Sequence, residues 1–224
     1  MLELRNFTVL RSGKKVVKNF NLLLEEGEKA VLAGPNGVGK TSLAEAVLGF
    51  LPFEGELLYR GRPVRTKEDF KLLRRKVGFV FQNPDDQLFM PTVREELAFA
   101  PANFGLSPAE VNRRVEAAAA LLGLEELLDE PTFSLSFGQR RLVSIACVLT
   151  AEPELLILDE PTNGLDRENW LRVARFLNET EKTVLVITHD RDLVTFLGWR
   201  VVLLSGTPLA SSWRTEIPDP YQCD

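Results

Sequence analysis

Apolar segments separated by helical patterns run along most of the sequence. Two early segments, Leu2–Leu10 and Leu22–Leu24, alternate between apolar and polar positions, which predicts an antiparallel pair with one solvated face. Five later segments are nearly continuous in Val, Ile, Leu or Phe, which is typical of strands that helices cover on both faces of a parallel sheet. These segments are Lys29–Ala33, Val77–Phe81, Leu155–Leu158, Thr183–Thr188 and Arg200–Leu204. The pattern predicts an α/β fold with a mostly parallel sheet and an added antiparallel β-layer.

The stretch from about Thr92 to Thr150 differs from the rest, because its apolar positions repeat at helical spacing. Within it, Ser107, Pro108 and Glu110 match a helix start with an N-cap, a first-turn proline and a capping-box carboxylate. A helical region is therefore expected in the middle of the chain. Residues 206–224 carry prolines and little periodicity, so they are predicted to form a surface tail.

Composition excludes several classes of protein. Lys and Arg number 27 against 32 Asp and Glu, so the net charge of −5 gives no basic footprint for nucleic acid. Two cysteines are too few for a disulfide scaffold and indicate a cytosolic protein. No apolar run approaches the roughly 18 residues of a transmembrane helix, and charges interrupt residues 1–15, where a signal peptide is hydrophobic. Any role at a membrane is expected to be peripheral, without a nucleic-acid partner.

The strongest chemical signal is a complete phosphate-loop pattern that follows the segment Lys29–Ala33 and precedes a helical pattern. It consists of Gly34, Pro35, Asn36, Gly37, Val38, Gly39, Lys40 and Thr41. Glycines allow successive backbone N–H groups to turn toward phosphate oxygens, and the following helix presents its positive end to the same anion. Lys40 is expected to bridge the β- and γ-phosphates, Thr41 to place a hydroxyl on Mg²⁺, and Ser42 to contact the α-phosphate. The loop predicts binding of a nucleotide.

Polar side chains follow three of the apolar segments, at the edge of a parallel sheet where ligands bind. Asp159 suits Mg²⁺, and Glu160 beside it is placed to activate a water molecule as a general base. His189 is expected to bond the γ-phosphate or to help fix that water. The amide oxygen of Gln82 suits Mg²⁺ or the same water. Together with the phosphate loop, these residues predict an ATPase site that takes ATP and Mg²⁺.

A second anion site is indicated by Leu135-Ser136-Phe137-Gly138-Gln139, which we name the signature segment. Ser136 is the expected N-cap of the helix that follows, and a helix start with a hydroxyl and a glycine can bind an anion. One phosphate loop already serves one nucleotide. The pattern therefore favours two chains arranged head to tail, in which Ser136, Gly138 and Gln139 of one chain face the γ-phosphate held by the other. Routine helix capping is the alternative interpretation.

Six motifs in this order resemble those of an ABC-type ATPase over about residues 2–205. They are the phosphate loop, Gln82, the signature segment, Asp159–Glu160, Asn163–Asp166 and His189. The segment Gln82–Phe89 and the Pro91-Thr92-Val93 that follows look like the energy-coupling-factor importers, particularly their cobalt and nickel branch. The resemblance implies a single ABC ATPase domain over residues 1–224 with a P-loop NTPase core. Residues 1–90 and 151–205 would form the nucleotide-binding core, and residues 91–150 the helical subdomain with the signature segment.

The resemblance also implies partners and a location. Members of this family are ATP-hydrolysing subunits at the cytoplasmic face of the cell membrane, where they drive uptake of metal ions or vitamins. They pair with a second ATPase subunit, identical or distinct, and dock on a transmembrane coupling protein beside a membrane substrate-capture subunit. By similarity, Asn83–Phe89 and the following helices would receive the coupling helix, and Asp166 would contact the partner ATPase. ATP would close the pair and hydrolysis would reopen it.

Two positions depart from the family pattern. Where relatives carry an aromatic side chain that stacks on adenine, the register places Arg11 or Ser12, so the Arg11 guanidinium stacks on the base or base recognition is weak. The first glycine of the signature is Phe137, which resembles bulky residues in cobalt-type members, and activity is expected to survive. The alternatives are a soluble ABC-type ATPase and a non-hydrolysing regulatory half of a heterodimer.

Overall fold

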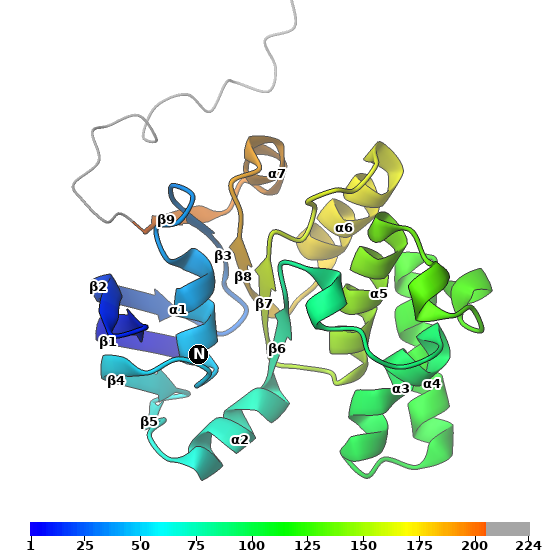
Figure 1. The fold of residues 1–224 in the computed structure, drawn as a ribbon, viewed down its shortest axis with the longest axis horizontal. Coiled ribbons are helices and arrows are strands. Elements are labelled where there is room, and N and C mark those ends of the chain that lie inside the picture. The colour runs from blue at the N-terminus through cyan, green and yellow to red at the C-terminus, as the bar shows by residue number, and fades with distance from the viewer. Residues whose placement is uncertain (205–224) are drawn as a thin grey trace, which may run out of the picture.

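The computed structural model describes residues 1–204, so the tail predicted at 206–224 lies outside the described residues. Its centre is a parallel sheet with the strand order β6-β7-β8-β3-β9 (Figure 1). The strands are β3 (Lys29–Ala33), β6 (Val77–Val80), β7 (Leu155–Asp159), β8 (Thr183–Ile187) and β9 (Arg200–Leu203). All five predicted inner strands are confirmed. For β9 the predicted burial on both faces is wrong, because this strand is the edge of the sheet and most of its residues are exposed.

A second, antiparallel sheet has the order β2-β1-β4-β5. Its strands are β1 (Leu2–Arg11), β2 (Lys14–Leu24), β4 (Phe53–Tyr59) and β5 (Arg62–Pro63). The predicted antiparallel pair is confirmed. However, β2 is longer than predicted, since shifts of register in its pairing with β1, between Leu4 and Leu10, interrupt the regular alternation. The sequence pattern did not predict β4, because Glu54, Gly55 and Glu56 leave its first half polar and exposed.

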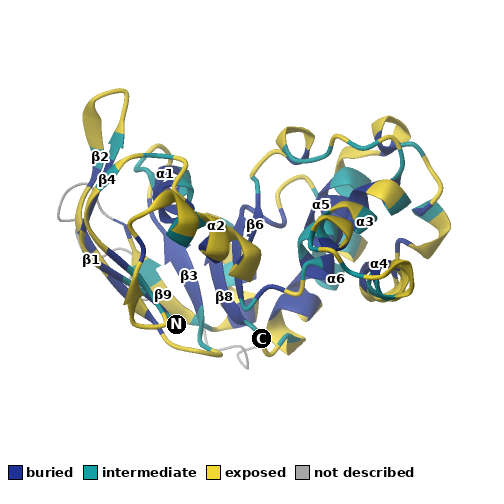
Figure 2. Cartoon of the chain, turned by 90° about the horizontal axis from the view of Figure 1, so that it is seen from below, coloured by how far each residue is buried: buried dark blue, intermediate teal, exposed yellow. Residues whose placement is uncertain are grey.

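The described residues contain seven α-helices, of which α1 lies between the two sheets and α3 to α6 lie on the opposite side of the parallel sheet (Figures 1 and 2). They are α1 (Lys40–Val47), α2 (Lys67–Lys76), α3 (Val93–Asn103), α4 (Pro108–Leu122), α5 (Phe137–Thr150), α6 (Arg167–Glu179) and α7 (Arg191–Leu197). Helices α3, α4 and α5 account for the helical pattern predicted in the middle of the chain. Ser107 caps α4 as predicted, but the Glu110 carboxylate binds Arg113 and Arg114 instead of closing a capping box.

The parallel sheet separates two clusters of buried apolar side chains. Leu156 and Leu158 of β7 face the cluster formed with helices α3 to α6, whereas Leu155 and Ile157 face the cluster formed with α1 and the antiparallel sheet. This explains why the inner strands read as continuous apolar runs. The two packed faces fix the ends of the strands, and the loops that follow these ends carry the polar residues described next. Within residues 1–204, none of the helices has the length and apolar character needed to cross a membrane.

Candidate functional site

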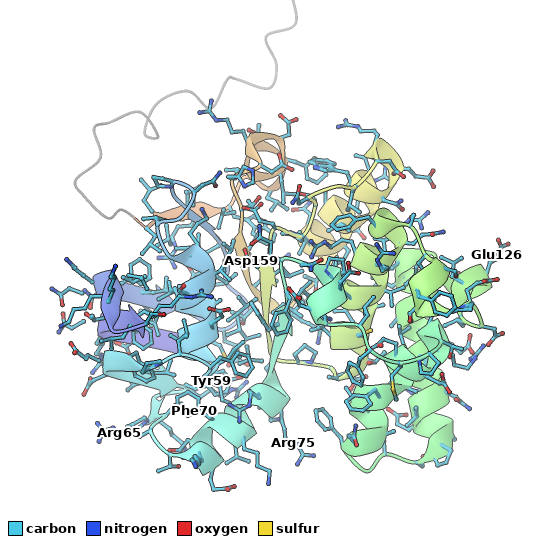
Figure 3. All side chains as sticks on the ribbon, in the orientation of Figure 1. Tyr59, Arg65, Phe70, Arg75, Glu126 and Asp159 are labelled. Carbon is cyan, nitrogen blue, oxygen red and sulfur yellow. The ribbon has the colours of Figure 1, made fainter. Side chains whose placement is uncertain are left out.

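A cavity of about 570 Å³ lies at the carboxyl edge of the parallel sheet. It is lined by Arg11, Val16, Asn36, Gly37, Gly39, Lys40, Thr41, Ser42, Glu45, Gln82, Asp159, Glu160 and His189. In Figure 3 the labelled Asp159 marks its position near the middle of the molecule, at the end of β7. The structure thus brings together the phosphate loop and the polar residues that follow β6, β7 and β8.

The loop from Gly34 to Gly39 needs glycine for two separate reasons. Gly37 and Gly39 have φ values of +77° and +104°, which side-chain-bearing residues rarely adopt. A Cβ atom on Gly39 would also lie 2.9 Å from Val17 of β2. The helix that follows, α1, has no side-chain cap at its N-terminus. Its first backbone N–H groups therefore remain available to an anion, which fits a phosphate group.

Lys40 is buried, and its ammonium group folds back over its own loop. Nζ donates hydrogen bonds to Gly34 O at 2.8 Å and to Pro35 O at 3.1 Å. Among the described residues, no carboxylate oxygen lies within 4.0 Å of this nitrogen to form an ion pair. A buried ammonium that binds only carbonyl groups lacks an ion-pair partner in contact, and triphosphate oxygens would supply one.

Thr41 and Asp159 join α1 to the end of β7. The Thr41 hydroxyl donates a hydrogen bond to Asp159 Oδ2 at 2.5 Å. Asp159 is almost fully buried, and burial raises its pKa to about 6, while Thr41 and Lys40 oppose that rise. Hydroxyl and carboxylate oxygens are the donors that Mg²⁺ prefers, and a bound cation would favour the charged carboxylate. The donor set therefore fits Mg²⁺.

Three donors orient the Glu160 carboxylate. The Thr188 hydroxyl donates to Oε2 at 2.8 Å, the His189 backbone N–H donates to Oε1 at 3.2 Å, and His189 Nδ1 lies 2.6 Å from Oε1. Glu160 has a φ of +49°, a left-handed conformation that is uncommon for a residue with a side chain. The sequence predicted His189 near the water or the γ-phosphate, and the structure places its ring directly on Glu160. Thr188 was not predicted, although a hydroxyl directly after a buried strand was a visible signal.

The signature segment lies outside the cavity. Ser136 is the N-cap of α5, as predicted: its Oγ accepts a hydrogen bond from Gln139 N at 3.2 Å, and Gln139 Oε1 accepts one from Ser136 N at 2.8 Å. None of Ser136, Gly138 and Gln139 lines the cavity. The Phe137 ring packs against Gly164, where an added Cβ would lie 2.6 Å from Phe137 Cε1. The predicted site residues therefore form two separate sets within one chain.

Arg11 is the only planar side chain with a positive charge at the cavity wall in the described residues. Its Nη1 donates hydrogen bonds to Ser42 Oγ and to Glu45 Oε2, each at 3.1 Å. No aromatic side chain other than the imidazole of His189 lines this cavity in residues 1–204. This agrees with the departure from the family pattern noted in the sequence. Glu45, which holds the guanidinium in place, was not predicted.

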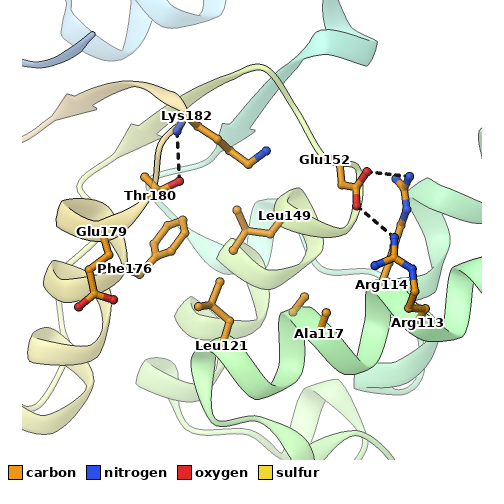
Figure 4. Close-up of a pocket in the computed structure, with 11 residues that line it drawn as sticks. Arg113, Arg114, Ala117, Leu121, Leu149, Glu152, Phe176, Glu179, Thr180 and Lys182 are labelled. Carbon is orange, nitrogen blue, oxygen red and sulfur yellow. Dashed lines mark hydrogen bonds and ion pairs between the residues drawn. The ribbon is translucent and has the colours of Figure 1, made fainter. Parts of the chain in front are cut away.

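A second cavity, of about 300 Å³, lies between α4, α5 and α6 (Figure 4). Leu121, Leu149 and Phe176 form apolar walls, and Glu152 pairs with Arg113 and Arg114 at the rim. None of the predicted site residues lines it. Lys182 at its edge donates a hydrogen bond to Pro153 O at 2.9 Å.

Comparisons with known proteins agree with this geometry. The chain matches the family of ABC transporters over residues 17–163. It is 44% identical over 222 residues to the energy-coupling factor transporter ATP-binding protein EcfA of Methanoculleus marisnigri, covering 96% of this chain and 80% of that protein. Among solved structures it is similar to cbiO1 from Clostridium perfringens, described as part of the ABC transporter complex cbiONQ (TM-score 0.80, 35% identity, 91% and 84% of the two chains).

A further similar structure is a dimeric ATP-binding cassette in a post-hydrolysis state bound to ADP and Pi (TM-score 0.82, 28% identity, 91% and 94% of the two chains). This protein is therefore an ATP-binding ATPase that belongs to the ABC transporter family, with energy-coupling-factor ATP-binding proteins among its relatives.

Proposed function

We propose that this chain is the ATP-hydrolysing subunit of a membrane importer of the energy-coupling-factor type, for cobalt or nickel ions or a vitamin. The observation that carries the proposal is the gathering of Lys40, Thr41, Asp159 and Glu160 around one cavity at the carboxyl edge of the sheet. The names of the EcfA relatives and of the cbiO1 neighbour from the cbiONQ complex support the type of importer. The chain would act at the cytoplasmic face of the cell membrane as a peripheral subunit.

The phosphate loop holds the nucleotide in this proposal. Backbone N–H groups of Asn36–Gly39 and of the start of α1 bind the phosphates, Lys40 neutralises the β- and γ-phosphates, and Ser42 contacts the α-phosphate. Thr41, Gln82 and Asp159 are the residues that would hold Mg²⁺, whose charge, when the ion is bound, offsets the negative charge of the phosphates.

Glu160 acts as the general base of hydrolysis. Its carboxylate accepts a proton from the attacking water, and Thr188 and His189 fix its orientation by the hydrogen bonds described above. His189 thereby keeps the base aimed into the cavity, a role that differs from the contact with the γ-phosphate or the water expected from the sequence.

The signature segment completes the site of a second ATPase subunit. Ser136, Gly138 and Gln139 lie away from the cavity of their own chain, so we infer that they face the γ-phosphate bound by the partner. Two ATP molecules would then lie at the interface of a homodimer or heterodimer. Phe89 and Phe99, the latter on α3, are an exposed aromatic pair with ring centroids 4.8 Å apart. This pair suits the apolar side of a coupling helix from the transmembrane protein.

Copurification tests the proposal. The chain is used as bait in detergent-solubilised membranes, the bound proteins are identified by mass, and ATP turnover is measured in the complex. A transmembrane coupling protein together with a small capture subunit is the expected result. Recovery of soluble protein or nucleic acid alone would favour the soluble ATPase instead. Recovery of the membrane partners with a second, different ATPase but no turnover by this chain's own site would favour a regulatory half.

A further inference from the structure

Arg141 is the largest side chain that is fully buried in the described residues. It lies on α5, five positions after the N-cap Ser136, among buried residues that are mostly apolar. Arginine is almost never fully buried unless it is paired, because removing its charge from water is costly. Neither the phosphate-binding loop nor the proposed base uses this residue. Its burial therefore requires another explanation.

The guanidinium binds two successive carbonyl groups at the end of β6. Nη1 donates a hydrogen bond to Phe81 O at 2.6 Å, and Nη2 donates one to Gln82 O. A planar fork with several N–H donors matches two neighbouring acceptors in a way that a lysine cannot. These carbonyls belong to the point where the chain leaves the sheet, immediately before the loop that enters the next helices.

Further contacts attach the same loop to α5. The Gln87 side chain accepts a hydrogen bond from Phe81 N at 3.1 Å and donates one to Ser144 O at 2.6 Å. Arg140 forms an ion pair with Asp85 at 2.9 Å. Three residues of α5, Arg140, Arg141 and Ser144, thus fix the loop after β6 to this helix.

Gln82 itself reaches the cavity without a side-chain partner. Its side chain lines the cavity but makes no hydrogen bond within residues 1–204. Its backbone carbonyl oxygen accepts a hydrogen bond from the Arg141 side chain. The position of the amide therefore depends on the backbone to which it is attached. Asp159 and Glu160 also attract the Arg141 charge, which opposes the lowering of its pKa by burial.

We propose that Arg141 is a positioning residue that fixes Gln82 to the helix beginning at Ser136. The two carbonyl contacts of Arg141 hold the backbone of Gln82 against α5, and thereby set where the Gln82 amide lies in the cavity, the amide that would contact Mg²⁺. The inference rests on the proposed function in one respect, the assignment of Gln82 to Mg²⁺.

The test compares Arg141→Met with Arg172→Met, an arginine that binds the Leu122 carbonyl at 2.8 Å, away from the cavity. The readout is the affinity for a fluorescent ATP analogue, with EDTA and with Mg²⁺. In EDTA, Arg141→Met is expected to bind within about twofold of the parent, since the phosphate loop is intact. The gain in affinity on adding Mg²⁺ is expected to fall by about tenfold, with no such fall in Arg172→Met.

A double-mutant cycle separates positioning from a general structural effect. Gln82→Ala is expected to lose the same Mg²⁺-dependent gain, and adding Arg141→Met to it is expected to cause no further loss. Independent, additive losses would overturn the proposal, as would an unchanged gain in Arg141→Met. If Arg141→Met does not fold, Arg141→Lys, which keeps the charge but binds a single point, decides by the same cycle with an intermediate loss.

The outcomes for the proposed function are distinct. In a Glu160→Gln background, ATP-driven dimerisation measured by light scattering is expected to weaken with Arg141→Met. Absence of any dimer in the Glu160→Gln parent would count against the proposed pairing of two subunits. The affinity measurements on the single chain would still decide the role of Arg141.

Discussion

The nucleotide cavity and the start of α5 both carry groups suited to phosphate, but their groups are held in different ways. In the cavity, Thr41 is fixed by Asp159 and Glu160 by His189, so each of these two groups is held by a partner from another element. At the start of α5, Ser136 and Gln139 bind only each other within one turn of one helix. The cavity is assembled by the fold, whereas the Ser136 and Gln139 side chains of the signature segment are held by contacts within one helix end.

This difference has a physical origin. The parallel sheet collects the ends of β6, β7 and β8 at one edge, so residues distant in sequence converge there without any partner chain. A helix N-terminus is formed locally and faces whatever lies in front of it. The cavity is therefore preorganised in a single chain, and the signature segment acquires its function only through a second molecule. The following predictions test this contrast.

The largest effect is expected from Glu160→Gln, which removes the base while keeping the side-chain shape. Release of phosphate from ATP is expected to fall by about 10²- to 10⁴-fold, while ATP binding persists and an ATP-bound dimer accumulates. Phosphate release and light scattering measure the two effects. Glu168→Gln, an exposed position on α6, serves as the control and should leave both unchanged. Turnover retained in Glu160→Gln would assign the base elsewhere.

The next effect tests the signature segment by separating capping from phosphate binding. Ser136→Asp keeps a good N-cap but places a negative charge before the partner's γ-phosphate. The midpoint of thermal unfolding is expected to stay unchanged, and hydrolysis is expected to fall by about 100-fold, a loss of roughly 3 kcal/mol in transition-state stabilisation.

Mixing two inactive chains sharpens that result. Lys40→Ala disables the cavity and Ser136→Asp disables the signature segment, so a mixed pair contains one intact composite site. An equal mixture is expected to recover about a quarter of the parent turnover, because half of the pairs are mixed and each has one working site of two. If the mixture stays inactive while the two variants do form pairs, the signature segment does not act on the partner.

At Asp159 a substitution is expected to stabilise the folded chain, whereas the substitutions above reduce activity. Burial raises its pKa to about 6, so the charged carboxylate destabilises the folded chain above that pH. In EDTA at pH 8, Asp159→Asn is expected to raise the free energy of unfolding by up to about 3 kcal/mol. The gain should shrink as the pH falls from 6 toward 4, where Asp159 is protonated. Urea unfolding at pH 8 and at pH 4 measures the gain in the free energy of unfolding. An equal gain at pH 8 and pH 4 would exclude the charge of Asp159 as the cause of the gain.

The smallest effect concerns recognition of the adenine base of ATP. If the Arg11 guanidinium stacks on adenine, Arg11→Phe is expected to retain ATP affinity within about threefold, while Arg11→Lys loses about 1 kcal/mol because it lacks a planar face. Fluorescence titration with ATP measures both. The reverse order of affinities would indicate that Arg11 contributes its charge, for instance to a phosphate, and not its plane.

The sequence allowed the residues that line the cavity to be predicted more fully than the residues that hold them in place. Lys40, Thr41, Asp159 and Glu160 stand in motifs whose spacing follows from one loop and one strand end. Thr188, Glu45 and Arg141 act through contacts between distant elements, which no local pattern specifies. The same reason explains the missed elements. Only Leu73 is buried in α2, and the exposed polar start of β4 hides its pairing with β1.

The contact between Phe137 and Gly164 has a consequence for how this sequence can change over generations. The aromatic ring lies where any side chain at position 164 would clash, and Gly164 also has a φ of +74°. A lineage that gains a bulky residue at position 137 can keep it only with glycine at position 164. The two positions are therefore expected to vary together among homologous sequences. A chimera that receives this signature segment must receive the glycine as well.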